Sequence, residues 1–171
     1  MNINKYIYSL KSRIFTFLKF HRLSNPIYIG KNSDIKGNVK ILGSVVLDDN
    51  VEIRNRTSKD LVIYMGCSFN RNSVVRGNVI IKENVAIGPN TVIIGANHNF
   101  ENISVPINKQ GSNSKGILIE CNVWIGANVT VLDGVTIGEG SVIGAGSVVS
   151  KSIPAFSVAV GVPCRVIKTR T

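Results

Sequence analysis

Histidine, cysteine and acidic residues are scarce in this sequence, and each scarcity excludes a class of protein. The chain contains two histidines and three cysteines, Cys67, Cys121 and Cys164. The cysteines are odd in number and no two have CxxC spacing, so the sequence predicts neither a disulfide framework nor a zinc site, and no metal. Free thiols in a reducing cytosol are the simplest interpretation.

Long apolar runs are also missing. The longest one near the N-terminus, Ile14 to Leu18, is interrupted by Thr16 and stopped by Lys19. A secretory signal needs a longer apolar core, and a membrane span needs about 18 apolar residues. We therefore expect a cytoplasmic protein.

The charge balance is one-sided. Twenty Lys and Arg face ten Asp and Glu, which gives a net charge of +10 on 171 residues. So basic a domain is expected to meet a phosphorylated ligand, a polyanion or an anionic surface, although solubility alone is the alternative explanation. The length suits a single domain, and the 44% hydrophobic content can supply its core.

A six-residue period runs through most of the chain. An aliphatic or phenylalanine residue recurs every sixth position in three series, 17 hexads in all, and four residues later a small or β-branched residue follows in most of them. Neither a helix (period 3.6) nor an ordinary strand (period 2) has this repeat. The three series are Ile29, Ile35, Ile41, Leu47, Ile53; Ile63, Phe69, Val75, Ile81, Ile87, Ile93; and Ile119, Ile125, Val131, Ile137, Ile143, Val149.

A third column explains how each hexad ends. Three residues after the aliphatic stands Asn or Gly in 13 of the 17 hexads, and these residue types tolerate positive φ. Each hexad is therefore a short strand followed by a sharp corner, and three hexads close one triangular coil. The sequence predicts an all-β fold, a parallel β-helix of about six coils over residues 27–155.

The period is interrupted twice. Between Ile53 and Ile63 the frame slips by four residues, which predicts a small bulge at a corner. Between Ile93 and Ile119 an insertion of 20 residues predicts one long, polar excursion loop at 97–116, near whose start stands His98. Loops of this length inside a compact domain are usually functional or disordered.

The two ends of the chain depart from the repeat. Residues 1–24 have apolar residues on one helical face and predict a short amphipathic helix. It is expected to cap the open end of the β-helix or, alternatively, to lie on an anionic membrane through residues 1–23 at its inner face. Residues 156–171 form a basic C-terminal segment.

The segments from Asn122 to Lys168, which include VWIGANV, IGAGSVV and VGVPCRVIK, resemble the hexapeptide-repeat acetyltransferases. The resemblance covers roughly residues 63–168 and is closest to the branch of maltose, galactoside, capsule and O-antigen O-acetyltransferases. The GANH tetrad ending at His98 also resembles the streptogramin-type acetyltransferases. The resemblance implies a left-handed β-helix, a homotrimer, and active sites between neighbouring subunits. It also implies that Trp124 is a family feature, which we expect to pack at a subunit contact.

The resemblance gives His98 the role of general base in a direct attack on the thioester, without an acyl-enzyme. A neutral imidazole can take a hydroxyl proton near neutral pH. The alternative for a lone histidine in a polar loop is an ordinary surface residue. Backbone N–H groups near Gly126 and Ala127 are candidate donors to the oxyanion.

The same resemblance implies a binding site for acetyl-CoA. Ala127 and Ala145 would line the pantetheine arm through their backbones, and small corner residues are the alternative explanation. The remaining cofactor-binding candidates, near the adenosine and phosphate end, are Ser150, Lys151, Arg165 and Lys168.

The acceptor is not identified by the sequence. Where disaccharide acetyltransferases carry polar sugar-binding residues, this chain has Ser68 and Arg76. We expect an acetyl-CoA-dependent O-acetyltransferase for a sugar of a surface polysaccharide or its lipid-linked or nucleotide-linked precursor, with no nucleic-acid partner. The alternatives are an amino sugar, serine or streptogramin-type antibiotic as acceptor, or a non-catalytic β-helix scaffold. A γ-class carbonic anhydrase would need three zinc-binding histidines.

Overall fold

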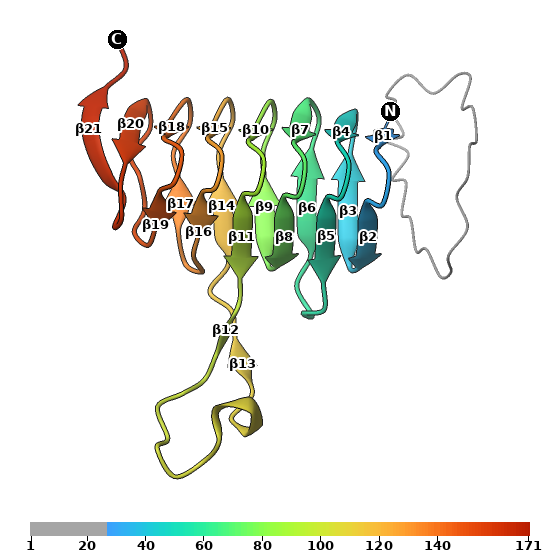
Figure 1. Cartoon of the computed structure of the whole chain (residues 1–171), viewed down its shortest axis with the longest axis vertical. Coiled ribbons are helices and arrows are strands. Elements are labelled where there is room, and N and C mark those ends of the chain that lie inside the picture. The colour runs from blue at the N-terminus through green and yellow to red at the C-terminus, as the bar shows by residue number, and fades with distance from the viewer. Residues whose placement is uncertain (1–26) are drawn as a thin grey trace, which may run out of the picture.

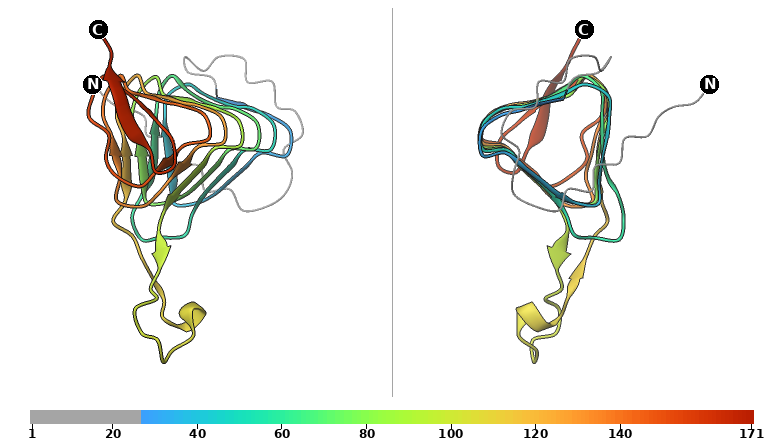
Figure 2. Two further views of the ribbon diagram at one scale, coloured as in Figure 1. Left: turned by 60° about the vertical axis from the view of Figure 1, so that its left-hand side comes forward. Right: turned by 90° about the vertical axis from the view of Figure 1, so that its right-hand side faces the viewer.

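The computed structural model describes residues 27–171, so the helix predicted at 1–24 and its two alternative roles lie outside the described residues. The chain winds into a triangular prism of stacked coils, with one long arm projecting from its side (Figure 1 and Figure 2). Apart from one 3-10 turn, η1 (Ile107–Lys109), the regular elements of this part are all strands.

Three sheets form the three faces of the prism. Face 1 contains β1 (Ile27–Ile29), β4 (Val45–Leu47), β7 (Cys67–Phe69), β10 (Ala86–Ile87), β15 (Trp124–Ile125), β18 (Val142–Ile143), β20 (Ser157–Val160) and β21 (Arg165–Thr169). Face 2 contains β2 (Asp34–Gly37), β5 (Glu52–Asn55), β8 (Val74–Gly77), β11 (Val92–Gly95), β16 (Thr130–Val131) and β19 (Val148–Val149). Face 3 contains β3 (Val39–Leu42), β6 (Leu61–Tyr64), β9 (Val79–Ile81), β14 (Ile117–Ile119) and β17 (Thr136–Ile137).

Successive coils pair in parallel and in strict register. Ile29 pairs with Leu47, one coil of three hexads later. The next pairing on this face, Leu47 with Phe69, absorbs the four extra residues, and Ile87 pairs with Ile125 although 20 extra residues lie between them. Both insertions are therefore looped out of the prism, and the register of the coils is undisturbed.

The predicted inward column forms the core. Fourteen of its 17 residues are buried. The exceptions, Ile29, Ile35 and Ile41, belong to the first coil, which has no other described coil on its N-terminal side. Burial of each aliphatic side chain contributes about 1.5–3 kcal/mol relative to exposure. The buried polar residues Ser73, Thr91, Ser141 and Ser147 occupy the small-residue column and donate hydrogen bonds to backbone carbonyls at the corners.

The corners are turned as predicted, with one systematic exception. We call the corner between faces 1 and 2 the first corner, that between faces 2 and 3 the second, and that between faces 3 and 1 the third. Eleven of the 13 predicted Asn and Gly residues have positive φ. The exceptions, Asn38 and Asn78, lie at the second corner, where the positive φ falls on the preceding residue, Gly37 or Gly77.

The prism continues beyond the predicted boundary at residue 155. Strand β20 pairs in parallel with β18, and this added strand gives about seven turns where the hexads predicted about six. The chain then reverses, and β21 pairs antiparallel with β20 at the edge of face 1. The basic segment at 156–171 is thus partly the last coil and partly the strand that covers it. The fold is the left-handed parallel β-helix of hexapeptide repeats that the sequence predicted.

Candidate functional site

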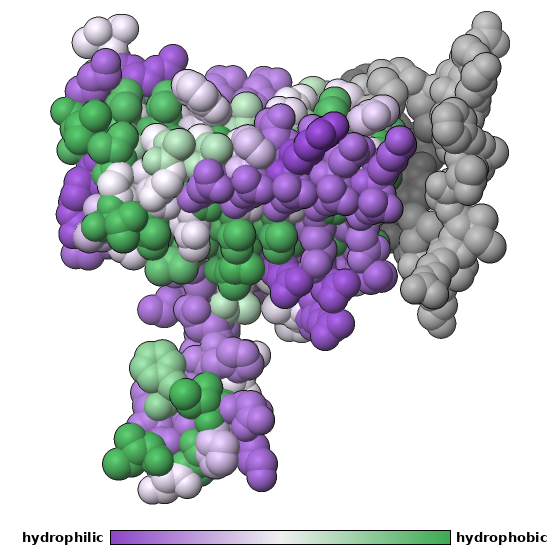
Figure 3. Space-filling view, in the orientation of Figure 1, coloured by the Kyte–Doolittle hydropathy of each residue, from purple (hydrophilic) through white to green (hydrophobic). Residues whose placement is uncertain are grey.

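The arm is the predicted excursion loop, and it leaves the prism at the second corner. It occupies residues 96–116, between β11 and β14. Its base is a two-stranded antiparallel ribbon of β12 (Asn97–His98) and β13 (Ser112–Asn113). At its tip, the side chains of Phe100, Ile103 and Ile107 are exposed, Ile103 to 99%, and apolar side chains are visible there in Figure 3. The arm therefore presents apolar groups that its own chain does not cover.

The structure places His98 at the base of this arm. It is exposed and stands opposite Ser112 in the ribbon. Within residues 27–171 no side chain forms a hydrogen bond or an ion pair with its imidazole ring. Both ring nitrogens are therefore accessible to a ligand, as a general base requires.

The predicted pantetheine-binding residues lie at the first corner, on two successive coils. The N–H of Gly126 donates to the carbonyl of Ile143 (2.8 Å), so it is not available as an oxyanion donor. A Cβ on Gly126 would stand 2.7 Å from the backbone nitrogen of Ala145, which explains the need for glycine. The N–H groups of Ala127 and Ala145 have no acceptor among the described residues. This corner thus offers two free donors beside small side chains.

Arg165 extends the first-corner group towards the C-terminal end of the prism. It pairs with Val160 across β20 and β21, and Val160 packs against Gly144 next to Ala145. Lys168 lies farther along the same strand, opposite Val158. Both cations are exposed, as a binding site for phosphate groups needs.

Ser150 and Lys151 are not at this corner. They follow β19 on face 2 and are exposed at the second corner, the same corner from which the arm emerges. Within one chain, therefore, the structure brings His98, Ser150 and Lys151 to the second corner and the other cofactor-binding candidates to the first. The width of face 2 separates the two groups.

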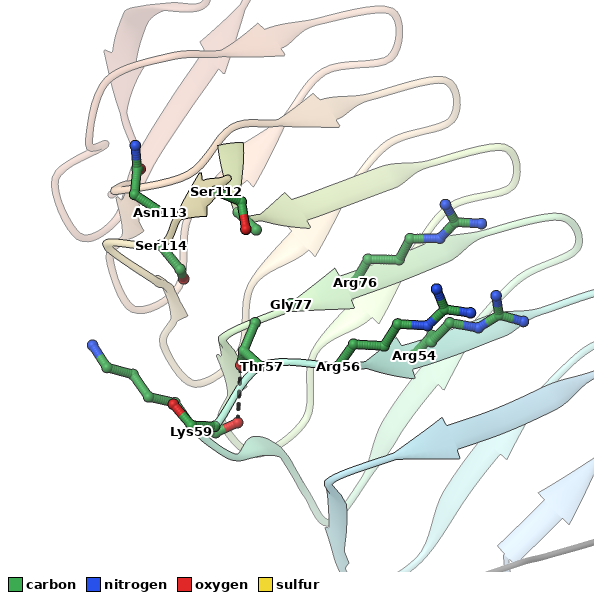
Figure 4. Close-up of a pocket in the computed structure, with 11 residues that line it drawn as sticks. Arg54, Arg56, Thr57, Lys59, Arg76, Gly77, Ser112, Asn113 and Ser114 are labelled. Carbon is green, nitrogen blue, oxygen red and sulfur yellow. Dashed lines mark hydrogen bonds between the residues drawn. The ribbon is translucent and has the colours of Figure 1, made fainter. Parts of the chain in front are cut away.

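An open cavity of about 540 Å³ lies at the base of the arm. Four cationic side chains line it, those of Arg54, Arg56, Lys59 and Arg76, and no acidic residue does. Ala96 and Ser112 from the arm also line it, which places the cavity beside the ribbon that carries His98 (Figure 4). The remaining lining residues are Thr57, Ser58, Gly77, Asn113 and Ser114.

One wall of the cavity is the bulge that the four-residue slip predicted. Asn55, which is buried, holds this loop closed with its amide group. Its nitrogen donates to the carbonyls of Asn38 (3.0 Å) and Lys59 (2.6 Å), and its oxygen accepts from the N–H (2.9 Å) and the hydroxyl (2.8 Å) of Thr57. All four hydrogen-bonding positions of the side chain are therefore used, and the loop is fixed where it borders the cavity.

Acidic residues outside the cavity engage two of its arginines. Arg76 donates two hydrogen bonds to Glu52 (2.8 and 2.9 Å). Arg54 is paired with Asp34 (3.4 Å) and approaches Glu52 (3.5 Å). The hydrogen bonds from Arg76 hold the pKa of the Glu52 carboxyl below its usual range, although burial opposes this shift. The carboxyl is therefore ionised at neutral pH and orients both guanidinium groups.

The sequence did not identify Arg54, Arg56 and Lys59 as site residues, although it did give a signal. The slip after Ile53 marked the bulge, and residues 54–59 contain three of the four cations. What the sequence did not show was that this bulge and the arm leave the prism at the same corner. The insertions are separated by about two coils along the chain, and stacking brings them together.

Comparisons with known proteins agree with this geometry. The bacterial transferase hexapeptide model, six repeats, matches residues 116–151. A galactoside O-acetyltransferase from Lactococcus lactis subsp. lactis (strain IL1403) is 45% identical over 100 residues, 58% of this chain and 47% of the relative. The chain thus spans about half the length of this curated relative. A solved maltose O-acetyltransferase from Clostridium difficile 630 is 31% identical, with 85% of this chain and 67% of that chain covered and a TM-score of 0.57.

The chain belongs to the hexapeptide-repeat transferase family. The predicted resemblance to hexapeptide-repeat acetyltransferases is confirmed. A further hexapeptide-like structure is that of AntD, an N-acyltransferase from Bacillus cereus, in complex with dTDP and coenzyme A. It is 24% identical, covers 85% of this chain and 81% of its own, and has a TM-score of 0.73; it supports the fold. In the described part of this hexapeptide-repeat protein, no helix is long and apolar enough to cross a membrane.

Proposed function

We propose that this protein is an acetyl-CoA-dependent O-acetyltransferase that transfers an acetyl group to a hydroxyl of a carbohydrate. One observation carries the proposal: His98 stands exposed and unpaired by other described side chains at the base of the arm, beside a cavity of about 540 Å³. A hexapeptide β-helix provides the rigid support for this site. The two relatives above 30% identity are both described as sugar O-acetyltransferases.

Transfer to oxygen is favoured over transfer to nitrogen by those relatives. The solved N-acyltransferase is 24% identical, and at that level the likeness concerns the fold. An amino sugar is therefore the second candidate acceptor, and the acceptor panel below includes one.

The chemistry needs one base and one stabilised oxyanion. The His98 imidazole would accept the hydroxyl proton while the hydroxyl oxygen attacks the thioester carbonyl. The carbon–sulfur bond then breaks, and the imidazolium returns its proton to the departing thiolate. The free N–H of Ala127 is a suitable donor to the oxyanion, whereas that of Gly126 is occupied within the coil.

We also propose that the site forms between subunits of a homotrimer. In one chain, His98 and the first-corner residues are separated by face 2, so a second copy has to supply one of the two groups. Two surfaces could make the contact: the exposed apolar tip of the arm, and Trp124, whose side chain is 57% exposed on face 1. Closed cyclic assemblies use such head-to-tail contacts.

A cytoplasmic location is part of the same proposal. Cys67, Cys121 and Cys164 are all free thiols, which suits a reducing compartment. Association of residues 1–23 with the inner face of a membrane stays a prediction.

Turnover of acetyl-CoA, measured by release of the thiol, tests the proposed function. The acceptor panel should contain neutral sugars, acidic sugars, sugar nucleotides, an amino sugar and serine. Thiol release that requires a sugar acceptor, with mass spectrometry locating the acetyl group on oxygen, is the expected result. Acetyl-CoA that neither binds in calorimetry nor turns over with any acceptor would favour the scaffold alternative.

A further inference from the structure

The cavity at the base of the arm concentrates positive charge beyond what its acidic neighbours neutralise. Arg54 and Arg76 are paired across β5 and β8 and share Glu52 as a partner. Neither Arg56 nor Lys59 has an acidic partner within 4 Å among residues 27–171. Two of the four cations are thus left without a counter-ion in this part of the chain.

The three guanidinium groups form one cluster. Arg54 and Arg56 are two residues apart, so an extended backbone directs their side chains to the same side, and Arg76 lies beside Arg54 on the next coil. Figure 4 shows these three side chains extending in the same direction. Moreover, the Nε of Arg54 is buried without a hydrogen-bond acceptor in the described structure. A buried donor without an acceptor is costly, and an anionic ligand would supply one.

The cluster lies on the same side of the molecule as the proposed base. Gly77, which follows Arg76, pairs with Gly95 at the start of the arm. Ser112, which stands opposite His98, lines the same cavity as Arg56 and Lys59. The hydroxyl groups of Ser112 and Ser114 and the amide of Asn113 provide neutral polar groups between the cations and the histidine. A sugar held there can present a hydroxyl to His98 and an anionic group to the arginines.

We propose that the acceptor is an anionic carbohydrate whose carboxylate or phosphate binds to the Arg54–Arg56–Lys59–Arg76 cluster. This inference rests on the proposed function and narrows its acceptor class. Guanidinium groups bind both kinds of oxyanion through paired N–H donors, so carboxylate and phosphate share the chemistry. The neutral disaccharides of the related sugar acetyltransferases would leave these cations unused.

Matched acceptors test the charge requirement. Methyl glucoside, methyl glucuronide and glucose 1-phosphate share a pyranose ring and differ in charge, and the latter two separate carboxylate from phosphate. We expect at least one acidic acceptor to have a kcat/KM about tenfold or more above that of methyl glucoside, and this preference to weaken as salt is added. Equal kcat/KM for neutral and acidic acceptors would overturn the inference.

Variants identify the residues. Arg56→Gln and Lys59→Gln, both at exposed positions, should each raise KM for the acidic acceptor about tenfold, with kcat little changed. Lys31→Gln removes an exposed charge at the first corner of the first coil and is the matched control, with KM unchanged. An equal rise in all three variants would show a general effect of net charge and contradict the assignment.

Binding without acetyl-CoA separates this inference from the proposed function. Inorganic phosphate and glucuronate should raise the melting temperature of the wild-type protein and raise it less in the Arg56→Gln variant. If these anions bind in this way but no acceptor is acetylated, the anion site stands and the proposed function fails. If neutral sugars are acetylated and anions neither bind nor compete, the proposed function stands and this inference fails.

Discussion

His98 stands directly opposite Ser112 in the ribbon at the base of the arm, and Ser112 lines the cationic cavity. The antiparallel pairing of two residues on each strand fixes the backbone of the proposed base against the wall of the proposed acceptor site. A histidine on an unsupported loop would lack this definition. The ribbon therefore links the two insertions that leave the prism at the second corner.

Replacement of the base is the first prediction. His98→Ala should lower kcat by at least two orders of magnitude, because a positioned base contributes about 10²–10⁴-fold. The melting temperature and the size of the assembly should stay as in the wild type, because the side chain is exposed. Lys109→Ala, an exposed change in the same arm, is the control, and near wild-type turnover of His98→Ala would exclude its role as base.

Mixed assemblies test whether the site is shared between subunits. His98→Ala removes the base from the second corner, and Ala145→Trp obstructs the first corner at an exposed position. Each variant alone should be inactive. Co-expressed in equal amounts and randomly assembled, they should regain about a quarter of wild-type activity if each site takes one corner from each of two subunits.

Recovery of activity on mixing cannot arise if one chain supplies both corners, since every site would then carry a defect. No recovery, with mixed assemblies confirmed by differently tagged chains, would place the whole site in one subunit. Wild-type chains diluted with either variant serve as the positive control for exchange.

Charge reversal at the C-terminal strand tests the phosphate end of the cofactor site. Arg165→Glu combined with Lys168→Glu should raise KM for acetyl-CoA and leave KM for the acceptor unchanged, because both residues lie on β21, away from the arm. Steady-state kinetics with each substrate varied in turn give the two values. An unchanged KM for acetyl-CoA in the double variant would remove β21 from the site.

The prism could be predicted because its interactions are local and repeated. One aliphatic residue per hexad faces the core, and Asn or Gly turns most corners, so the sequence shows both the strand and its end. The second corner departs from this rule at Asn38 and Asn78, where the preceding glycine takes the positive φ. Nothing in the hexad pattern distinguishes the two choices, because both residues tolerate that conformation.

The cationic cavity could not be predicted, because it is a product of register. Arg56 and Ser112 are 56 positions apart in the sequence, and they line one cavity only because both insertions occur at the same corner on nearby coils. The separation of His98 from Ala127 has the same cause. The hexad count assigns each residue to a coil, but the resemblance assigned all candidates to one site without regard to the corner.

The loop that borders the cavity should depend on Asn55. Asn55→Ala removes four hydrogen bonds and leaves backbone groups of Asn38 and Lys59 without partners, which should lower the free energy of unfolding by about 1–3 kcal/mol. Ser58→Ala, an exposed change in the same loop, should lie within about 0.5 kcal/mol of the wild type. Urea unfolding followed by circular dichroism gives both values, and equal stability of the two variants would contradict the role of Asn55.

The stability at alkaline pH should depend on Cys67. Burial raises the pKa of this thiol to about 11, whereas an unfolded cysteine titrates near about 8.5. The neutral thiol in the folded state therefore contributes stability that is fully present below the unfolded value. This contribution decreases as the pH rises through the interval up to about 11, because only the unfolded state releases its proton there.

Cys67→Ala should flatten this dependence. Urea unfolding at pH 8 and at pH values up to about 10.5 should show a smaller loss of stability in the variant than in the wild type, whatever the variant's stability at pH 8. Cys164→Ala is a weaker comparison, since burial also raises the pKa of that thiol. If the wild type and Cys67→Ala lose stability in parallel over this interval, the alkaline sensitivity arises from other groups.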